Sequence, residues 1–381
     1  MRVIRGYKFK LKTTPELQRA FAAMAGHARF VWNKALRLNL DRLERKAPIM
    51  RYSDLCGLLR LWKQSEEYGF LADAHSQALQ QKLKDLDRAF ADTFDKNQPL
   101  KKLPRFKKKG RGDSFRFPQD VKIDNRRVCL PKIGWVGFFK SQEVPGTIRQ
   151  ATVTREADGW YVSLQVEIEL PDPVSHTGSM IGLDRGVDVF AATSEGELVT
   201  PVNALKNALD KLARLQRELA RQKKFSKNWR KTRNRIAKLH RKIARTRHDF
   251  LHKLSSKISK SHAVVALEDL PVGNMTRSAK GTLENPGRNV RAKSGLNRAI
   301  LDQGWSMFER MLEYKLNEHG GQVVPVPAPG SSHTCSACGH ADPESRVSRN
   351  LFRCVKCGHT EHADVNAAKV ILQRAKVKLA A

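Results

Sequence analysis

Four cysteines near the C-terminus constrain this chain more than any other feature of its sequence. Cys335 and Cys338 form one Cys-x-x-Cys pair, and Cys354 and Cys357 form a second pair fifteen residues later. A glycine follows the second sulfur of each pair, which suits the tight turn of a zinc knuckle. We therefore predict a four-thiolate zinc ribbon. Its Zn²⁺ is expected to be structural, because four thiolates leave no open coordination position.

Other interpretations of the cysteines have less support. Redox chemistry needs only one Cys-x-x-Cys pair, so two matched pairs argue against it. Since four thiolates are present, we expect the neighbouring histidines to be solvated or to support the ligands: His333, His340, His359 and His362. Cys56 and Cys129 stand alone and are predicted to be small buried hydrophobic residues.

The net charge indicates the class of partner. The 381 residues include 71 Lys and Arg against 38 Asp and Glu, which gives a net charge of +33. Self-repulsion of this size destabilises a compact fold unless a polyanion neutralises it, so nucleic acid is the expected partner. The sequence has neither a run of about 18 apolar residues nor the apolar core of a signal peptide. We therefore expect an intracellular protein of two or three domains with no membrane partner.

Patterning in the N-terminal half predicts helices inserted into a β-domain. Residues 3–11 alternate apolar and basic residues, as a half-buried strand does. Thr14 is the predicted N-cap of a helix that begins at Pro15, and helical spacing continues to about residue 97. Short strand-like runs follow a connection rich in Pro, Gly and Lys, and the first strand could pair with them.

The C-terminal half alternates strands and helices. A buried strand and a hairpin around residues 194–196 precede two strongly basic helical stretches, which predict an antiparallel helical hairpin. A strand, a loop rich in Gly, Asn and Arg, and one helix over residues 298–320 follow. We predict a multidomain α+β protein with these parts: 1–14, first strand of a small β-barrel or sheet; 15–100, helical domain; 101–178, remainder of the barrel or sheet, ending in a linker at 171–179; 179–330, a domain of alternating strands and helices, with the basic hairpin at 203–262 and the loop at 273–297; 331–360, zinc ribbon; 361–381, C-terminal helix.

Three acids lie at the ends of predicted elements in this half. Asp184 ends the strand of "IGLDRG", Glu268 ends the strand of "VVALEDL", and Asp364 opens the helix of "DVNAAKVILQRA". Taken alone, each is most simply a strand-end or helix-cap carboxylate. Together, the order of strand with Asp, hairpin, strand with Glu and helix with Asp is the one that a ribonuclease-H-like fold needs. Carboxylates that meet at one sheet edge can hold two Mg²⁺ about 3.5–4 Å apart, which predicts two-metal-ion hydrolysis of a phosphodiester.

Several segments in this order resemble one known family. They are "LPRFKKKGRGDSFRF", "GLDRGV", "LEDL", "KSGLNRAILDQGWSMFERMLEYK", "SSHTCSACGH", "FRCVKCGH" and "HADVNAA". With them the chain resembles, over essentially its whole length, the transposon-encoded TnpB nucleases, which are similar to miniature type V CRISPR effectors.

The resemblance implies an RNA-guided DNA endonuclease with a RuvC-type active site. Asp184, Glu268 and Asp364 fall on the family's catalytic, Mg²⁺-binding acids, and the four cysteines fall on its zinc ligands. The implied partners are a guide RNA from the transposon end, bound by one protein monomer, and double-stranded target DNA with a short flanking motif. The implied location is the prokaryotic cytoplasm, with the protein on the nucleoid when it is bound to DNA.

Two positions depart from the family pattern. Arg185 stands where Leu is commoner, and Ala363 precedes the third acid where Arg is frequent. Neither change removes a metal ligand, so we expect effects on rate or strand preference only.

The resemblance also suggests candidate nucleic-acid contacts. Basic residues interleaved with aromatic residues are expected to bind RNA: Arg105, Lys107, Lys108, Lys109 and Arg111. The 203–262 helices resemble those beside a guide–target heteroduplex, which is recognised by the shape of its backbone. The β-barrel corresponds to the family's wedge domain, and Tyr52, Gln77 and Gln80 are candidates to read the flanking motif, because Gln can read adenine. The loop at 273–297 is a predicted lid.

A non-catalytic RNA-guided repressor, or an accessory protein of transposition, is the alternative function. Loss of one of the three acids would mark it, and all three are present.

Overall fold

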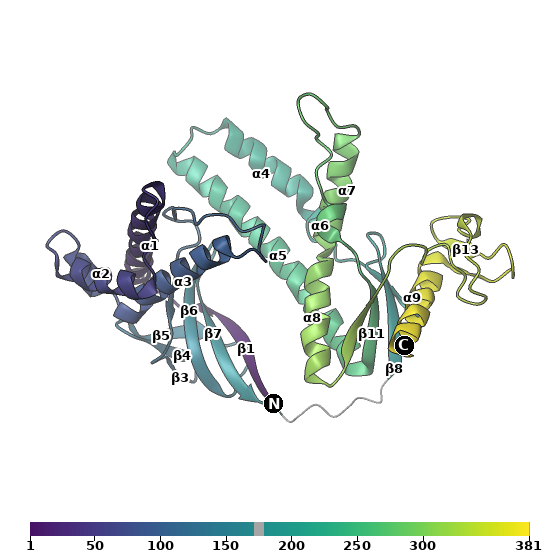
Figure 1. Cartoon of the computed structure of the whole chain (residues 1–381), viewed down its shortest axis with the longest axis horizontal. Coiled ribbons are helices and arrows are strands. Elements are labelled where there is room, and N and C mark those ends of the chain that lie inside the picture. The colour runs from purple at the N-terminus through teal and green to yellow at the C-terminus, as the bar shows by residue number, and fades with distance from the viewer. Residues whose placement is uncertain (171–178, 381) are drawn as a thin grey trace. The chain divides into compact units, whose positions relative to one another are not determined.

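The computed structural model describes residues 1–170 and 179–380, which divide into two compact units on either side of residues 171 and 172 (Figure 1). The linker predicted at 171–179 lies, apart from Ser179, outside the described residues. Within the described ranges, no helix is both long enough and apolar enough to cross a membrane.

The first unit is built on a seven-stranded antiparallel sheet. β1 (Arg2–Leu11) lies at its centre and pairs with β7 (Gly159–Glu169) and β5 (Gly134–Phe139), which confirms the predicted pairing of the first strand. The other strands are β2 (Ser114–Phe117), β3 (Lys122–Asp124), β4 (Arg127–Leu130) and β6 (Thr147–Glu156). Their order is β2-β6-β7-β1-β5-β4-β3, so the described strands form an open, curled sheet with β2 and β3 at its edges. Of the two predicted forms, a small barrel or a sheet, the structure has the sheet.

Helices fill the predicted insert between β1 and β2. They are α1 (Pro15–Glu44), α2 (Tyr52–Gln64), the short 3-10 helix η1 (Gly69–Asp73) and α3 (Ser76–Phe94). The side chain of Thr14 accepts a hydrogen bond from the Leu17 N–H, which confirms the predicted N-cap. Phe21 joins α1 to the sheet, because its ring lies 6.0 Å from that of Phe115 and 5.3 Å from that of Trp160.

A five-stranded mixed sheet organises the second unit. Its strands are β8 (Ser179–Arg185), β9 (Ala191–Thr193), β10 (Leu198–Val199), β11 (His262–Glu268) and β12 (Gln322–Val326). The order is β10-β9-β8-β11-β12. The first three strands form an antiparallel meander, and β11 runs parallel to both β8 and β12. The carboxyl ends of β8 and β11 therefore lie at the same edge.

The helices of this unit match the predicted hairpin but divide the predicted long helix. They are α4 (Leu209–Arg221), α5 (Lys227–Ser261), α6 (Val272–Met275), α7 (Val290–Gln303), α8 (Trp305–Glu318) and α9 (Ala363–Ala380). α4 contacts α5 through Glu218, which pairs with Arg235 at 3.0 Å and accepts a hydrogen bond from the Thr232 hydroxyl.

Two predictions for residues 273–320 need correction. The helix predicted over 298–320 is broken at Gly304, whose φ of +74° belongs to the left-handed region that glycine alone adopts freely. The predicted lid loop is only partly irregular, because α6 extends to Met275 and α7 already begins at Val290.

Candidate active site and zinc ribbon

The ends of two parallel strands carry the first two acids of the candidate site. Leu183 of β8 pairs with Leu267 of β11, so Asp184 and Glu268 follow at neighbouring positions of the same sheet edge. Asp184 is half-buried, and Glu268 is 7% exposed. Buried carboxylates at a strand end are costly without a cation or a hydrogen-bond donor.

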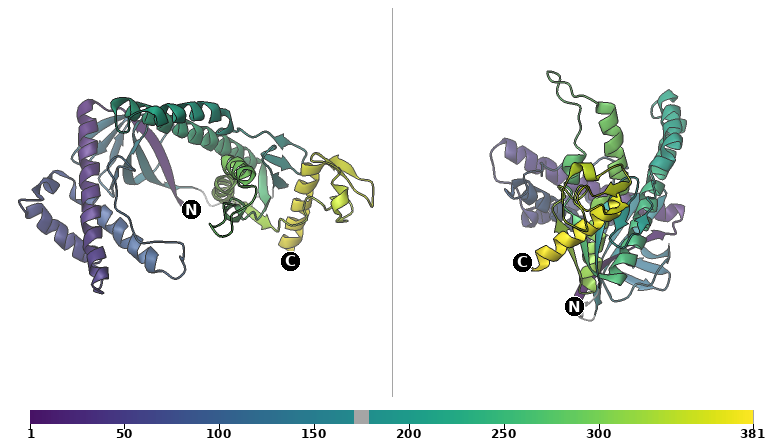
Figure 2. Two further views of the ribbon diagram at one scale, coloured as in Figure 1. Left: turned by 90° about the horizontal axis from the view of Figure 1, so that it is seen from above. Right: turned by 90° about the vertical axis from the view of Figure 1, so that its right-hand side faces the viewer.

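The third acid comes from α9, which packs directly on β8. A side chain at Gly182 would place its Cβ 2.1 Å from the Ala368 carbonyl oxygen, so only glycine permits this close approach. Asp364 lies in the first turn of α9. Figure 2 shows this helix, in yellow, beside the cysteine-bearing loops and the sheet.

The charges of the other two acids act on Asp184. The pKa of Asp184 is raised to about 7, first by burial and then by the negative charges of Glu268 and Asp364. Arg346 and Arg185 act in the opposite direction on the same pKa. The carboxylates therefore repel one another, and a bound cation would relieve that repulsion.

The acids nevertheless do not form one compact cage. Among the described residues, only the four cysteines bring three or more His, Cys, Asp or Glu ligand atoms within 4.8 Å of one another. Each of two acids instead accepts a hydrogen bond from the protein: Glu268 from the Ser331 hydroxyl, and Asp364 from Arg346 at 3.3 Å.

Arg185 connects the strands that carry the first two acids. Its side chain is fully buried, pairs with Glu309 at 3.0 Å and donates to the backbone carbonyl of Glu268. The strand end that carries Glu268 is thus held to the strand that carries Asp184. The sequence marked Arg185 only as a departure from the family pattern.

The predicted zinc ligands do converge. The sulfur atoms of Cys335 and Cys357 lie 3.7 Å apart, and those of Cys338 and Cys354 lie 3.6 Å apart. Four sulfurs at about 2.3 Å from a tetrahedral Zn²⁺ would be separated by about 3.8 Å, so the cluster fits this ion.

Both knuckles have the geometry that zinc turns need. Gly339 donates to the Cys335 carbonyl and Gly358 to the Cys354 carbonyl, and each glycine has a φ of +74°. Hydrogen bonds from the backbone N–H groups of Cys357 and Lys356 lower the pKa of the Cys354 thiol to about 6, which favours the metal-binding thiolate. None of the four nearby histidines belongs to the cluster.

The ribbon holds the start of α9. Ala363 is fully buried and packs with Phe352, Cys335 and Cys354 in a small core. Asn366 binds the first knuckle twice: its side chain accepts from the Ser336 N–H at 2.9 Å and donates to the Thr334 carbonyl at 2.8 Å. These contacts tie the first turn of α9, which carries Asp364, to the metal-binding loops.

The basic segment of the first unit lies against α1. Arg105, Lys108, Lys109 and Arg111 are exposed, as RNA contacts must be. Lys107 differs, because its ammonium lies 3.6 Å from the centre of the Trp32 ring and burial lowers its pKa to about 8.

The candidates for reading the flanking motif are only partly accessible. Tyr52 packs against the core of the first unit, and burial is the main cause of its raised pKa. Gln77 and Gln80 are half-buried on α3. The side-chain oxygen of Gln77 is buried without a hydrogen-bond partner among the described residues.

Comparison with known proteins assigns the family. Residues 163–279 match the IS605 OrfB model, described as "Probable transposase", and residues 305–371 match the "Cas12f1-like, TNB domain". The chain is 45% identical, over its full length and 94% of the relative, to the Escherichia coli (strain K12) protein named "Putative RNA-guided DNA endonuclease InsQ". The chain belongs to the IS605 OrfB (TnpB) family. A Streptomyces pristinaespiralis TnpB relative, also named "Putative RNA-guided DNA endonuclease", is 32% identical over 97% of this chain and 89% of its own.

Two further comparisons qualify this assignment. Residues 1–47 match a model described as "Helix-turn-helix domain", but in this TnpB protein they form a strand and one long helix. The solved structure of the mini-RNA-guided endonuclease CRISPR-Cas_phi3 covers 98% of the chain and 92% of its own at 12% identity, with a TM-score of 0.49. This superposition is loose, so membership of the TnpB family rests on the sequence relatives.

Proposed function

We propose that this chain is an RNA-guided DNA endonuclease of a transposon, which cleaves double-stranded target DNA next to a short flanking motif. The names of the two full-length relatives support the activity, and the net charge of +33 supports partnership with RNA and DNA. We propose Asp184, Glu268 and Asp364 as the catalytic residues.

The observation that carries the catalytic assignment is the shared environment of the three acids. They come from positions 184, 268 and 364, yet two of them raise the pKa of the third. Their elements follow the order strand, hairpin, strand, helix, which is the order of a ribonuclease-H-like (RuvC-type) nuclease. This agreement supports a domain layout with the nuclease in residues 179–330 and 361–381 and the ribbon inserted at 331–360.

The donor set fits divalent ions of the Mg²⁺ type. Carboxylate oxygens are hard ligands, and an Asp184 that is hard to ionise alone becomes a good ligand once a cation offsets its neighbours. Divalent ions held there by the three acids would supply an activated water and stabilise the leaving oxygen of a phosphodiester. Arg185 fixes the backbone of Glu268, and the ribbon fixes Asp364, so the chain itself orients the ligands. The cysteine cluster would hold a structural Zn²⁺.

Other parts of the chain would hold the nucleic acids. The exposed basic residues of segment 105–111 and of the helices α4 and α5 suit phosphate contacts. Tyr52, Gln77 and Gln80 remain the proposed readers of the flanking motif, and residues 276–289 remain the irregular part of a lid. One protein chain per guide RNA is the proposed stoichiometry.

The experiment is a cleavage assay on the purified complex. The RNA that co-purifies with the chain is sequenced, and a plasmid that matches its guide is incubated with the complex and Mg²⁺. We expect the wild-type complex to cut the plasmid, and Asp184→Asn to bind the same DNA without cutting it. Asp269→Asn is the matched control, because Asp269 is an exposed carboxylate directly after Glu268; it should cut normally.

Two results would contradict the proposal. A wild-type complex that binds matched DNA in Mg²⁺ without cutting it would favour the non-catalytic repressor or accessory protein. Unchanged cleavage by Asp184→Asn would remove Asp184 from the active site while leaving the nuclease activity itself intact.

A further inference from the structure

The first unit contains a pocket that the proposed function does not use. It lies between α1 and residues 67–70, which end in the first turn of η1, and has a volume of about 640 Å³, a size that suits a small organic ligand. Its lining residues are Gly26, His27, Arg29, Phe30, Asn33, Lys34, Glu67, Tyr68 and Phe70. The α1 members recur at helical spacing, so they share one face of that helix.

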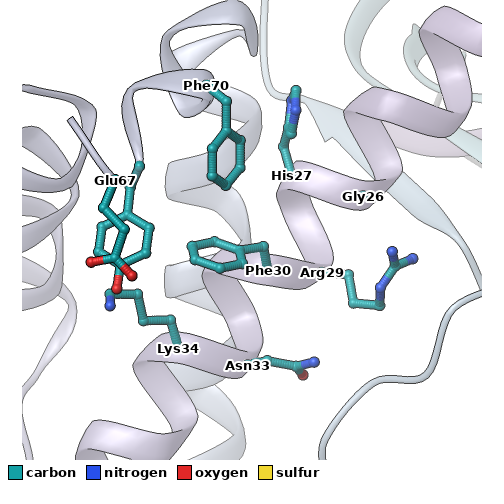
Figure 3. Close-up of a pocket in the computed structure, with 9 residues that line it drawn as sticks. Gly26, His27, Arg29, Phe30, Asn33, Lys34, Glu67 and Phe70 are labelled. Carbon is teal, nitrogen blue, oxygen red and sulfur yellow. The ribbon is translucent and has the colours of Figure 1, made fainter. Parts of the chain in front are cut away.

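Aromatic rings dominate this pocket. The centre of the Phe70 ring lies 5.3 Å from that of Phe30, in an edge-to-face arrangement, and 5.5 Å from that of His27. Figure 3 shows these three rings close together among the residues that line the pocket. Phe70 is 42% exposed, so part of its ring remains open to solvent although it contacts Phe30 and His27. A flat π-system could therefore stack here without displacing the core.

Polar groups around the rings suit a nucleotide. The Nδ1 atom of His27 is buried and has no hydrogen-bond partner among the described residues. Burial also lowers the pKa of His27, which favours the neutral ring, and a neutral imidazole offers one donor and one acceptor. The ammonium of Lys34 lies 3.8 Å from the centre of the Tyr68 ring, which places a positive charge at the pocket wall.

The pocket lies next to the basic segment 105–111, with Asn33 between them. Trp32 of α1 donates to the Arg105 carbonyl at 3.1 Å, and Asn33, which lines the pocket, exchanges two hydrogen bonds with the backbone of Lys107. Arg29, also a lining residue, pairs with Asp113 at 3.2 Å. These contacts hold exposed cations beside the aromatic rings. Proteins bind single-stranded nucleic acid by stacking its bases on aromatic rings and by pairing its phosphates with neighbouring basic residues.

We propose that this pocket takes one unstacked base of the guide RNA, while segment 105–111 holds the adjoining phosphates. The inference rests on the proposed function, because it assumes that the chain carries a guide RNA. RNA is favoured over the target DNA because proteins recognise RNA mainly at unpaired loops and bulges, whereas target DNA arrives as a duplex. The site would anchor the folded scaffold of the RNA at one splayed nucleotide.

A cavity-filling substitution tests this without weakening the fold. A Cβ at Gly26 would meet only the Arg29 guanidinium, at 3.8 Å, so Gly26→Leu fits on α1 and fills the pocket. Leu also favours a helix more than Gly does. Gly57→Leu is the matched control, since Gly57 lies inside α2, outside the pocket, with no atom within 4 Å of its Cβ position. Phe70→Ala removes one stacking surface instead.

The probe is the RNA extracted from the purified complex, sequenced and transcribed in vitro. We expect Gly26→Leu and Phe70→Ala to bind it roughly 5- to 150-fold more weakly than wild type, since stacking of one base is worth about 1–3 kcal/mol. Gly57→Leu should bind normally. In chemical probing of the bound RNA, one unpaired nucleotide should lose its protection in both pocket variants.

The outcomes separate this inference from the proposed function. A wild-type chain that binds no RNA would refute both. If the wild type binds RNA and both pocket variants bind it equally tightly with unchanged probing, only the pocket assignment is wrong. If the variants keep RNA binding but lose binding of the matched DNA, the pocket serves the DNA, and the inference is likewise overturned.

Discussion

Gly182 offers a direct test of how the third acid reaches the site. A Cβ at this position would lie 2.1 Å from the Ala368 carbonyl oxygen and 2.9 Å from the Cβ of Leu372. Real Cβ contacts do not fall below 3.0 Å, and the nearest obstacle is helix backbone, which cannot rotate away as a side chain can. In Gly182→Ala, α9 must therefore retreat from β8 by roughly 1 Å, and Asp364 moves with it.

The size of this displacement sets the expected effect. A misplacement of about 1 Å in a catalytic group can cost about 100-fold in rate, so we expect cleavage of matched DNA to fall by about that factor. Overpacking of a core by one methyl group costs about 1–3 kcal/mol. Because a unit of this size loses roughly 2–4 °C per kcal/mol, its melting temperature should drop by several degrees without loss of folding.

The assay compares single-turnover cleavage, RNA content and thermal melting of the purified complex. Gly6→Ala is the matched control, because Gly6 lies within β1 and its Cβ would have no atom within 4 Å. Normal RNA content with about 100-fold slower cleavage in Gly182→Ala alone is the expected pattern. Wild-type cleavage by Gly182→Ala would show that the close packing of α9 does not position Asp364.

Three further predictions follow from the site. Arg185→Leu leaves the Glu268 carbonyl and the Glu309 carboxylate without their hydrogen-bond donor. Thermal melting should therefore show a loss of about 1–3 kcal/mol in the free energy of unfolding, and cleavage should be slower. A Leu variant with unchanged melting and cleavage would contradict the role of Arg185. Removal of zinc with a chelator, or the substitution Cys338→Ser, should abolish cleavage while the RNA stays bound. Metal content and plasmid cutting are the two measurements. Full cutting by zinc-free protein would refute the support of α9 by the ribbon. The fold raises the pKa of Asp184 to about 7, so between about pH 4 and pH 7 this carboxyl group holds its proton in the folded protein but not in the unfolded chain. The free energy of unfolding of the metal-free protein should therefore fall by up to about 4 kcal/mol as the pH rises from about 4 to 7. Melting curves of metal-free wild type and Asp184→Asn check this, since the Asn variant should lose the dependence and equal curves would disprove it.

Local sequence signals predicted the parts of this fold that depend on neighbouring residues. The N-cap at Thr14 needs only the next turn of helix, and the cysteine turns need only the glycine that follows each pair. The helical spacing predicted up to about residue 97 is also a local pattern, and in α3 its apolar members are fully buried: Leu79, Leu83, Leu86 and Phe90. Such features survive in any tertiary context that offers one apolar surface.

Contacts between distant segments escaped prediction because no local pattern encodes them. The break at Gly304 depends on α5, since a Cβ there would meet Arg247 at 3.1 Å and Leu251 at 3.2 Å. A helical pattern runs through this position, and only the packing partner explains the glycine. The aromatic pocket is similar, because Phe30 and Phe70 meet only after the chain has folded back.

The two departures from the family pattern now have different physical meanings. Ala363 is fully buried in the small core of the ribbon, where a long charged side chain would have to displace Phe352 or a cysteine. The guanidinium that pairs with Asp364 comes instead from Arg346, within the loop between the two cysteine pairs. Ribbon and acid are thus joined twice, once through apolar packing and once through charge. A metal-bound ribbon would therefore transmit its rigidity to Asp364 by both routes, and this coupling explains why a structural metal site lies directly before a proposed catalytic residue.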